Sequence, residues 1–84
     1  MFHKVKSVKA ISKYVLKVTF QNNIIKYYDV SILFNKWKAF ENLKEIEGLF
    51  EMVKVDQGGY GIIWNDEIDL GCEELWKNGV DKAK

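Results

Sequence analysis

The chain has 84 residues, 48% of them hydrophobic and 30% charged, so it has room for one domain and too much apolar surface for a disordered segment. Its single cysteine excludes an intramolecular disulfide, and we expect a reducing, cytoplasmic location. The first residues carry no signal-peptide pattern, and no apolar stretch approaches the length of a membrane span.

The net charge of +1 hides an uneven distribution along the chain. Residues 1–28 contain six lysines and no acidic residue, whereas residues 29–84 contain seven lysines and all twelve acidic residues. There is no arginine, so the usual bidentate contact to guanine is missing. Three interpretations of the basic third remain open: protection of exposed strand edges, an acidic protein partner, or nucleic acid.

The N-terminal third predicts three strands. A first extended segment runs from about His3 to Ile11, and residues 14–20 alternate between two faces. One face of this second strand carries Tyr14, Leu16, Val18 and Phe20. Residues 21–23 predict a tight hairpin turn because asparagine tolerates positive φ, and residues 24–29 return as a third strand.

The middle of the chain changes to a helical period. Ser31 can cap a short helical turn through Asn35, and apolar residues at steps of three and four predict one irregular helix or two short ones over residues 39–52. Strands return at 53–56 and 60–64.

The chain then predicts a short strand over residues 68–70 and a terminal helix over residues 72–78, which ends at Gly79. The order is three strands, helix, two to three strands, C-terminal helix. Segregated strands and helices joined by short turns predict a single α+β domain over residues 1–84, with a mainly antiparallel sheet of five to six strands.

Few residues could carry catalysis or bind a metal. His3 is the one histidine and lies near a terminus that we expect to fray. Cys72 opens a helix whose dipole would lower the thiol pKa, although an ordinary, partly buried thiol is the favoured interpretation. Asp66, Glu67 and Asp69 predict a solvated turn because the calcium-loop pattern is missing. We therefore expect no enzyme, no metal and no cofactor.

The three tryptophans have different expected roles. Trp64 ends an apolar strand and is expected in the core, and Trp76 is expected to attach the last helix to the sheet. Trp37 lies between two lysines, where it is either a partly buried lid or an exposed binding residue. The candidate partner-binding set consists of Trp37 and four lysines of the basic third, namely Lys4, Lys6, Lys17 and Lys26.

Short stretches across nearly the whole chain match a known pattern. The most distinctive is the stretch 63–70, whose residues Trp64, Asp66 and Asp69 form, with the later Trp76, a structural motif. The remaining matches are Phe20-Gln21-Asn22-Asn23, Asp29, Leu43, Phe50, Val53-x-Val55-Asp56, Leu75 and Gly79. From about Val5 to Gly79 the chain resembles a small bacterial family, domain of unknown function 2442.

Two turns depart from that family. Its members usually have Asp-Gly at the first hairpin, where this chain has Asn22-Asn23. They usually have proline and glycine flanking the aspartate Asp66, where this chain has Asn65 and Glu67. The departures concern turn geometry and leave the expected fold unchanged.

The resemblance implies an α+β domain that, in longer members, precedes a helix-turn-helix domain. Family genes often lie beside a second small gene, in tandems regarded as candidate toxin–antitoxin pairs. The resemblance implies no catalytic residues in this chain, because none is established for the family. Because the chain ends at Lys84, we expect it to lack the DNA-binding half.

These observations favour a non-enzymatic protein-binding module, the antitoxin-like or regulatory member of a two-gene bacterial pair. Its expected partner is a small protein encoded nearby. The alternative is a small-ligand-binding or transcription-associated domain. We expect neither a membrane partner nor nucleic acid bound by the chain alone, and the sequence leaves homo-oligomerisation open.

Overall fold

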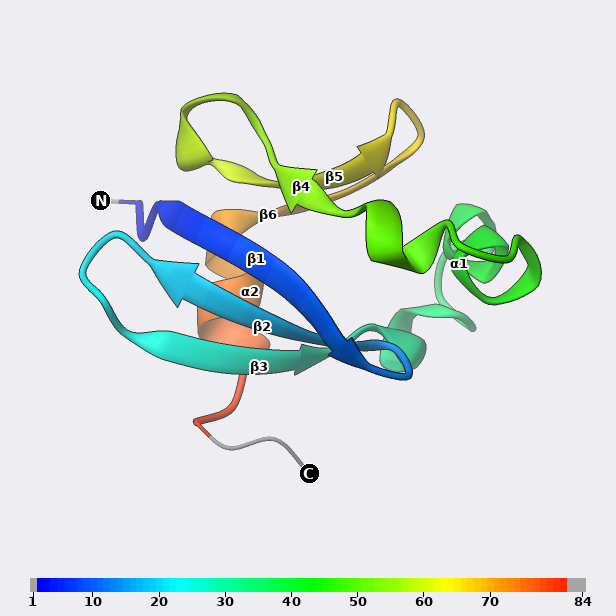
Figure 1. Cartoon of the computed structure of the whole chain (residues 1–84), viewed down its shortest axis with the longest axis horizontal. Coiled ribbons are helices and arrows are strands. Elements are labelled where there is room, and N and C mark those ends of the chain that lie inside the picture. The colour runs from blue at the N-terminus through cyan, green and yellow to red at the C-terminus, as the bar shows by residue number, and fades with distance from the viewer. Residues whose placement is uncertain (1, 82–84) are drawn as a thin grey trace.

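The computed structural model describes residues 2–81, and its six strands form two three-stranded antiparallel sheets (Figure 1). Sheet A contains β1 (Val5–Ser12), β2 (Val15–Phe20) and β3 (Ile25–Asp29). Sheet B contains β4 (Lys54–Val55), β5 (Gly61–Asn65) and β6 (Ile68–Gly71). The helices are α1 (Asn42–Glu45) and α2 (Cys72–Asn78). The predicted α+β class and C-terminal helix are confirmed, and the strands divide between two sheets.

Sheet A has one buried face and one open face. Leu16, Val18 and Phe20 of β2 are fully buried, because successive side chains of a strand point to opposite faces. The register of β1 against β2 shifts twice, between Val5 and Ser7 and again nearer the hairpin. Such irregularities bend a strand, and β1 forms the edge of sheet A that lies beside β4 (Figure 1).

The turns of sheet A place two non-glycine residues at positive φ. Asn23 has φ 71° at the tip of the second hairpin, where the sequence predicts a turn. Tyr14, predicted as a strand residue, instead has φ 64° in the first hairpin. This region is unfavourable for a bulky residue, and edge-on packing of the Tyr14 ring on Phe34 at 5.0 Å and Phe50 at 5.7 Å stabilises it.

The segment between the sheets is irregular. Four short 3-10 turns punctuate the chain: η1 (Val30–Leu33), η2 (Lys38–Glu41), η3 (Phe50–Met52) and η4 (Gln57–Gly59). Of the two possibilities predicted over 39–52, the structure has short helical pieces: η2 continues directly into α1, and η3 follows after a break where Ile46 is extended and Gly48 has φ 84°. The cap expected at Ser31 belongs to Asp29, whose carboxylate accepts from the Ser31 amide at 3.0 Å and hydroxyl at 2.6 Å.

The buried side chains form one continuous hydrophobic core between the two sheets and α2. Trp64 of β5 is 5% exposed, and its Nε1–H donates to the Phe50 carbonyl oxygen at 3.0 Å. Its ring contacts Phe40 at 6.0 Å and Phe50 at 6.3 Å between centroids. Trp64 therefore joins sheet B to the irregular segment. None of the helices within residues 2–81 has the length and apolarity that a membrane crossing requires.

The first prediction concerns this tryptophan. Trp64→Ala should lower the free energy of unfolding by about 3–5 kcal/mol, because it removes a buried ring and leaves a cavity. Trp64→Phe keeps an aromatic ring and loses the bond to Phe50, so its cost should be about 1–2 kcal/mol. Trp37→Ala is the matched control, since this ring is 51% exposed and its loss should cost under about 1 kcal/mol.

Urea denaturation followed by circular dichroism measures all three variants. Equal midpoints for Trp64→Phe and wild type, together with a folded, stable Trp64→Ala, would contradict the assignment of Trp64 to the core.

Candidate functional site

The four candidate lysines do not gather at one place. Lys17 lies on the open face of sheet A, in register with Lys9. Lys4 lies on another side of the molecule, with its Nζ 4.8 Å from the centre of the Tyr60 ring. The Lys6 Nζ donates to the side-chain oxygen of Asn23 at 3.4 Å. Lys4 therefore lies apart from Lys17, and the set expected from sequence does not form one cluster.

Lys26 belongs to the fold. Its Nζ donates to the carbonyl oxygen of Trp76 at 2.7 Å and lies 4.3 Å from the centre of that ring. An ammonium group near the C-terminal end of a helix stabilises the unpaired carbonyls there. Gly79 follows α2, and a Cβ at this position would come within 3.0 Å of the Lys26 Cβ and closer still to the Leu75 carbonyl oxygen. Lys26 thus attaches α2 to β3.

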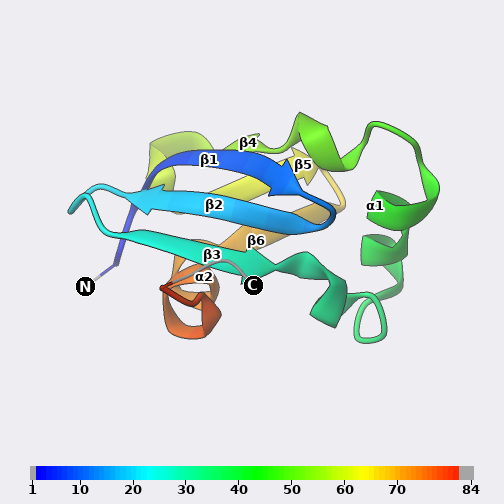
Figure 2. The same ribbon diagram turned by 60° about the horizontal axis from the view of Figure 1, so that its bottom comes forward.

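The open face of sheet A carries two lysines directly opposite each other. The register pairs Lys9 of β1 with Lys17 of β2, and Lys17 with Tyr27 of β3. The next row on the same face is Ser7, Thr19 and Ile25. We call these six residues the lysine face. Figure 2 shows sheet A as the front layer with sheet B behind it, and α2 packs against the core side.

The N-terminal end packs against α2. The His3 ring stacks on Trp76 with 3.9 Å between centroids, and the Trp76 ring also meets Phe20 edge-on at 5.0 Å. The His3 amide donates to Glu73 Oε2 at 2.6 Å, and His3 Nδ1 lies 3.1 Å from the same oxygen. His3, expected from sequence near a fraying terminus, is thus packed against α2. These bonds from His3 lower the pKa of the Glu73 carboxyl.

Cys72 is buried at the start of α2, with 2% of its surface exposed. Burial, followed by the negative charge of Glu73, raises the pKa of the Cys72 thiol, so the helix-dipole expectation of a lowered pKa is wrong. The Cys72 Sγ faces the Glu73 carboxylate, 3.9 Å from its Oε2. A histidine, a carboxylate and a thiol therefore lie close together, on His3, Glu73 and Cys72. The raised pKa of the thiol disfavours the thiolate that a nucleophile needs.

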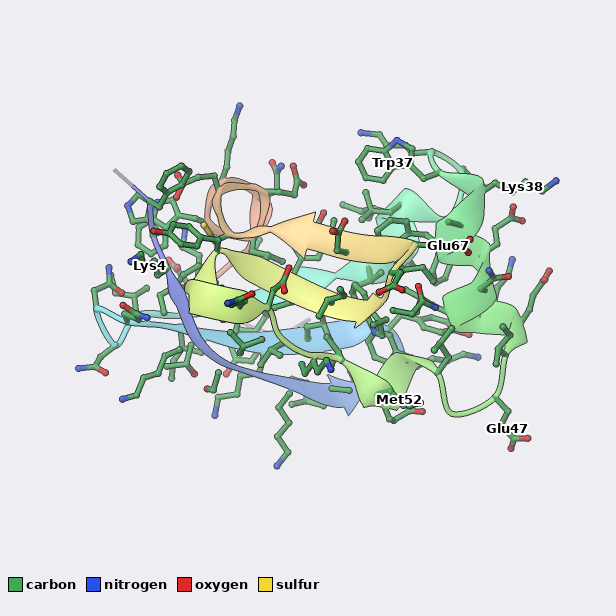
Figure 3. All side chains as sticks on the ribbon, turned by 90° about the horizontal axis from the view of Figure 1, so that it is seen from above. Lys4, Trp37, Lys38, Glu47, Met52 and Glu67 are labelled. Atoms are coloured by element: carbon green, nitrogen blue, oxygen red, sulfur yellow. The ribbon has the colours of Figure 1, made fainter. Side chains whose placement is uncertain are left out.

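An open groove of about 450 Å³ runs along β6. Aromatic side chains of the irregular segment form an aromatic wall, and three carboxylates are among the other lining residues. Its lining residues are Trp37, Ala39, Phe40, Glu67, Asp69, Leu70, Gly71 and Glu74. Figure 3 shows Trp37 and Glu67 at the same end of β6. We call this the β6 groove.

Glu74 is held in the β6 groove by two donors. The Tyr28 hydroxyl and the Asn78 side-chain amide both donate to Glu74 Oε2, each at 2.8 Å. Tyr28 is 1% exposed, and burial followed by its bond to Glu74 raises the pKa of the phenol above its ordinary range. The phenol therefore stays protonated and remains a donor to Glu74.

The β6 groove brings together residues that sequence reasoning kept apart. The sequence predicted partner binding for Trp37, a structural motif for Asp69 and a solvated turn for Glu67. It predicted no role for Glu74, which also lines the groove. Asp66, the remaining motif carboxylate, is exposed in the β5–β6 turn and does not line the groove. Among residues 2–81, no three His, Cys, Asp or Glu side chains form a group that could hold a metal ion.

Comparison with known proteins identifies a family. A family model described as "Protein of unknown function (DUF2442)" matches residues 5–81. No curated protein and no solved structure matches the chain. The match covers both sheets and α2, so it concerns the same unit that contains the lysine face and the β6 groove.

The second prediction concerns Glu73. A carboxyl whose pKa is lower in the folded state contributes stability above its unfolded pKa, near 4.5, and loses it as the pH falls through the folded value. Glu73→Gln should therefore lower the free energy of unfolding at pH 7 and make its decline below about pH 4.5 shallower. Glu47→Gln, at an exposed carboxylate after α1, is the control.

Chemical denaturation between pH 2.5 and 7, in steps of about half a unit, measures the effect. A wild-type acid limb that is unchanged in Glu73→Gln, or changed equally in Glu47→Gln, would contradict the role of the contact between His3 and Glu73.

Proposed function

This chain belongs to the DUF2442 family of proteins of unknown function. We propose that it is a non-enzymatic protein-binding module that docks an acidic protein on its lysine face. In this proposal it is the antitoxin-like or regulatory member of a two-gene bacterial pair. The observation that carries the proposal is the pairing of Lys9 with Lys17 on an open sheet face.

Like charges directly opposite each other destabilise a pair of strands. Within residues 2–81, neither Lys9 nor Lys17 has a carboxylate oxygen within 4.0 Å, so the described part of the chain leaves their charges uncompensated. A carboxylate from a partner would relieve the repulsion and gain a charge-assisted contact. Tyr27 and Ile25 in the same face offer apolar area beside the charges, as an interface needs.

Two features favour binding over catalysis. The Cys72 thiol is buried beside a carboxylate, and its raised pKa disfavours the thiolate. His3, the one histidine, is stacked on Trp76 and bonded to Glu73, so its ring is already engaged in the fold.

The alternative, a small-ligand-binding or transcription-associated domain, is favoured by a different observation. The β6 groove has about 450 Å³ and an aromatic wall, which are features of small-molecule sites. Binding of a small molecule there would leave the lysine face unused.

The third prediction tests the lysine face. The double variant Lys9→Glu/Lys17→Glu should associate with the product of the adjacent small gene at least about tenfold more slowly than wild type at low salt. The difference should fade above about 0.15 M salt, where the Debye length is about 8 Å. The control is Lys44→Glu/Lys77→Glu, which makes the same charge change at exposed sites outside sheet A.

Surface plasmon resonance over a salt series gives the rates. Equal association rates and salt dependence for the two double variants would refute docking on the lysine face. Tight, salt-sensitive binding of the wild type to duplex DNA alone would support the transcription-associated alternative.

A further inference from the structure

The outer edge of β6 carries unpaired backbone groups. The Gly61 carbonyl accepts from the Asp56 amide on the β4 side at 2.9 Å, and the Tyr60 carbonyl accepts from the Cys72 amide on the β6 side at 2.9 Å. Backbone groups of an antiparallel strand alternate in direction, so Leu70 pairs with β5. The N–H and C=O groups of Asp69 therefore point away from the sheet.

The same alternation turns the N–H of Gly71 outward, whereas the Gly71 carbonyl, as the N-cap of α2, accepts the first hydrogen bond of that helix. No described strand pairs with this edge, since β6 has β5 as its one neighbour in sheet B. A Cβ built on Gly71 would meet no atom within 4 Å, so the sheet face at this residue is also uncovered. The outward groups of Asp69 and Gly71 are two residues apart, which is the spacing at which an added strand forms its bonds.

The β6 groove lies along this free edge. Trp37 is 51% exposed and packs at 5.5 Å against Phe40, which in turn contacts Trp64 in the core. The aromatic wall is therefore supported from inside the molecule. An extended chain lying in the groove would have a strand edge on one side and an indole on the other.

The charge of the β6 groove is negative. Glu67, Asp69 and Glu74 line it, and no lysine does. Tyr28 and Asn78 both bond to one oxygen of Glu74, and among residues 2–81 no donor bonds to its other oxygen. A cationic side chain entering the groove would find carboxylate acceptors and a tryptophan face, two groups that attract lysine and arginine.

We propose that an extended segment of a second protein, with lysine or arginine at alternate positions, adds to β6 as a fourth strand of sheet B. Backbone bonds to Asp69 and Gly71 supply register, and the carboxylates select basic side chains. A second copy paired two-fold through the same edge is disfavoured, because it would bring Asp69 near its own symmetry mate. This inference goes beyond the proposed function and uses none of the lysine face.

The fourth prediction uses the full chain, labelled with nitrogen-15, and the blocked peptide acetyl-Lys-Val-Lys-Val-Lys-Val-amide as the probe. Titration should give saturable shifts centred on the Asp69 and Gly71 amides and the Trp37 indole N–H. Two further peptides are N-methylated at every second amide. The amides methylated in one peptide are the ones left free in the other. One of them should bind at least about tenfold more weakly and the other should retain binding, because one set of amides faces β6.

Variants separate strand addition from general attraction. Glu67→Gln/Asp69→Asn changes two exposed side chains and should weaken peptide binding about three- to tenfold at low salt, while Glu47→Gln should leave it unchanged. Lys9→Glu/Lys17→Glu should also leave peptide binding unchanged. The test of strand addition at β6 is therefore independent of the test of docking on the lysine face.

Several results would overturn the proposal. Equal binding of both N-methylated peptides would reduce the contact to charge attraction without strand pairing. Shifts centred outside the β6 groove would place the peptide elsewhere. Absence of saturable binding would leave the short, charged edge as a protection against aggregation only.

Discussion

The bond between the Trp64 indole and the Phe50 carbonyl, 3.0 Å long, joins sheet B to the irregular segment that carries the aromatic wall of the β6 groove. Phe40 of the same segment packs on the Trp64 ring. Phe40 in turn supports Trp37, so the aromatic wall of the β6 groove depends on a contact in the core. A chain of 84 residues has few buried side chains to share this role, which makes each large one costly to lose.

Local features of the fold could be predicted from sequence, and features that depend on distant contacts could not. Alternation in β2 predicts its buried face, and the asparagine pair predicts the hairpin at Asn23, because both signals lie within a few residues. Tyr14 was misplaced because its positive φ is stabilised by rings from the irregular segment. The β6 groove was missed because it joins residues such as Trp37 and Glu74 from separate elements, and Glu74 is positioned by Tyr28, 46 residues away.

The charge asymmetry along the chain becomes a separation in space. The lysine face lies on the open side of sheet A, and the three carboxylates of the β6 groove lie along the edge of sheet B. Lys26, which sequence placed with the binding lysines, is instead used within the fold to hold α2. Two surfaces of opposite sign would orient charged partners before contact, and each would reject the partner suited to the other.

Amide hydrogen exchange of the isolated protein tests the central structural claim, that β6 has a free edge beside the groove. The amides of Asp69 and Gly71 face outward and should exchange at least about tenfold faster than those of Ile62 and Leu70, which pair across β5 and β6. Fast exchange at the first two and protection at the last two would support the account. Equal protection of all four amides would contradict it, because it would mean that the edge is already paired.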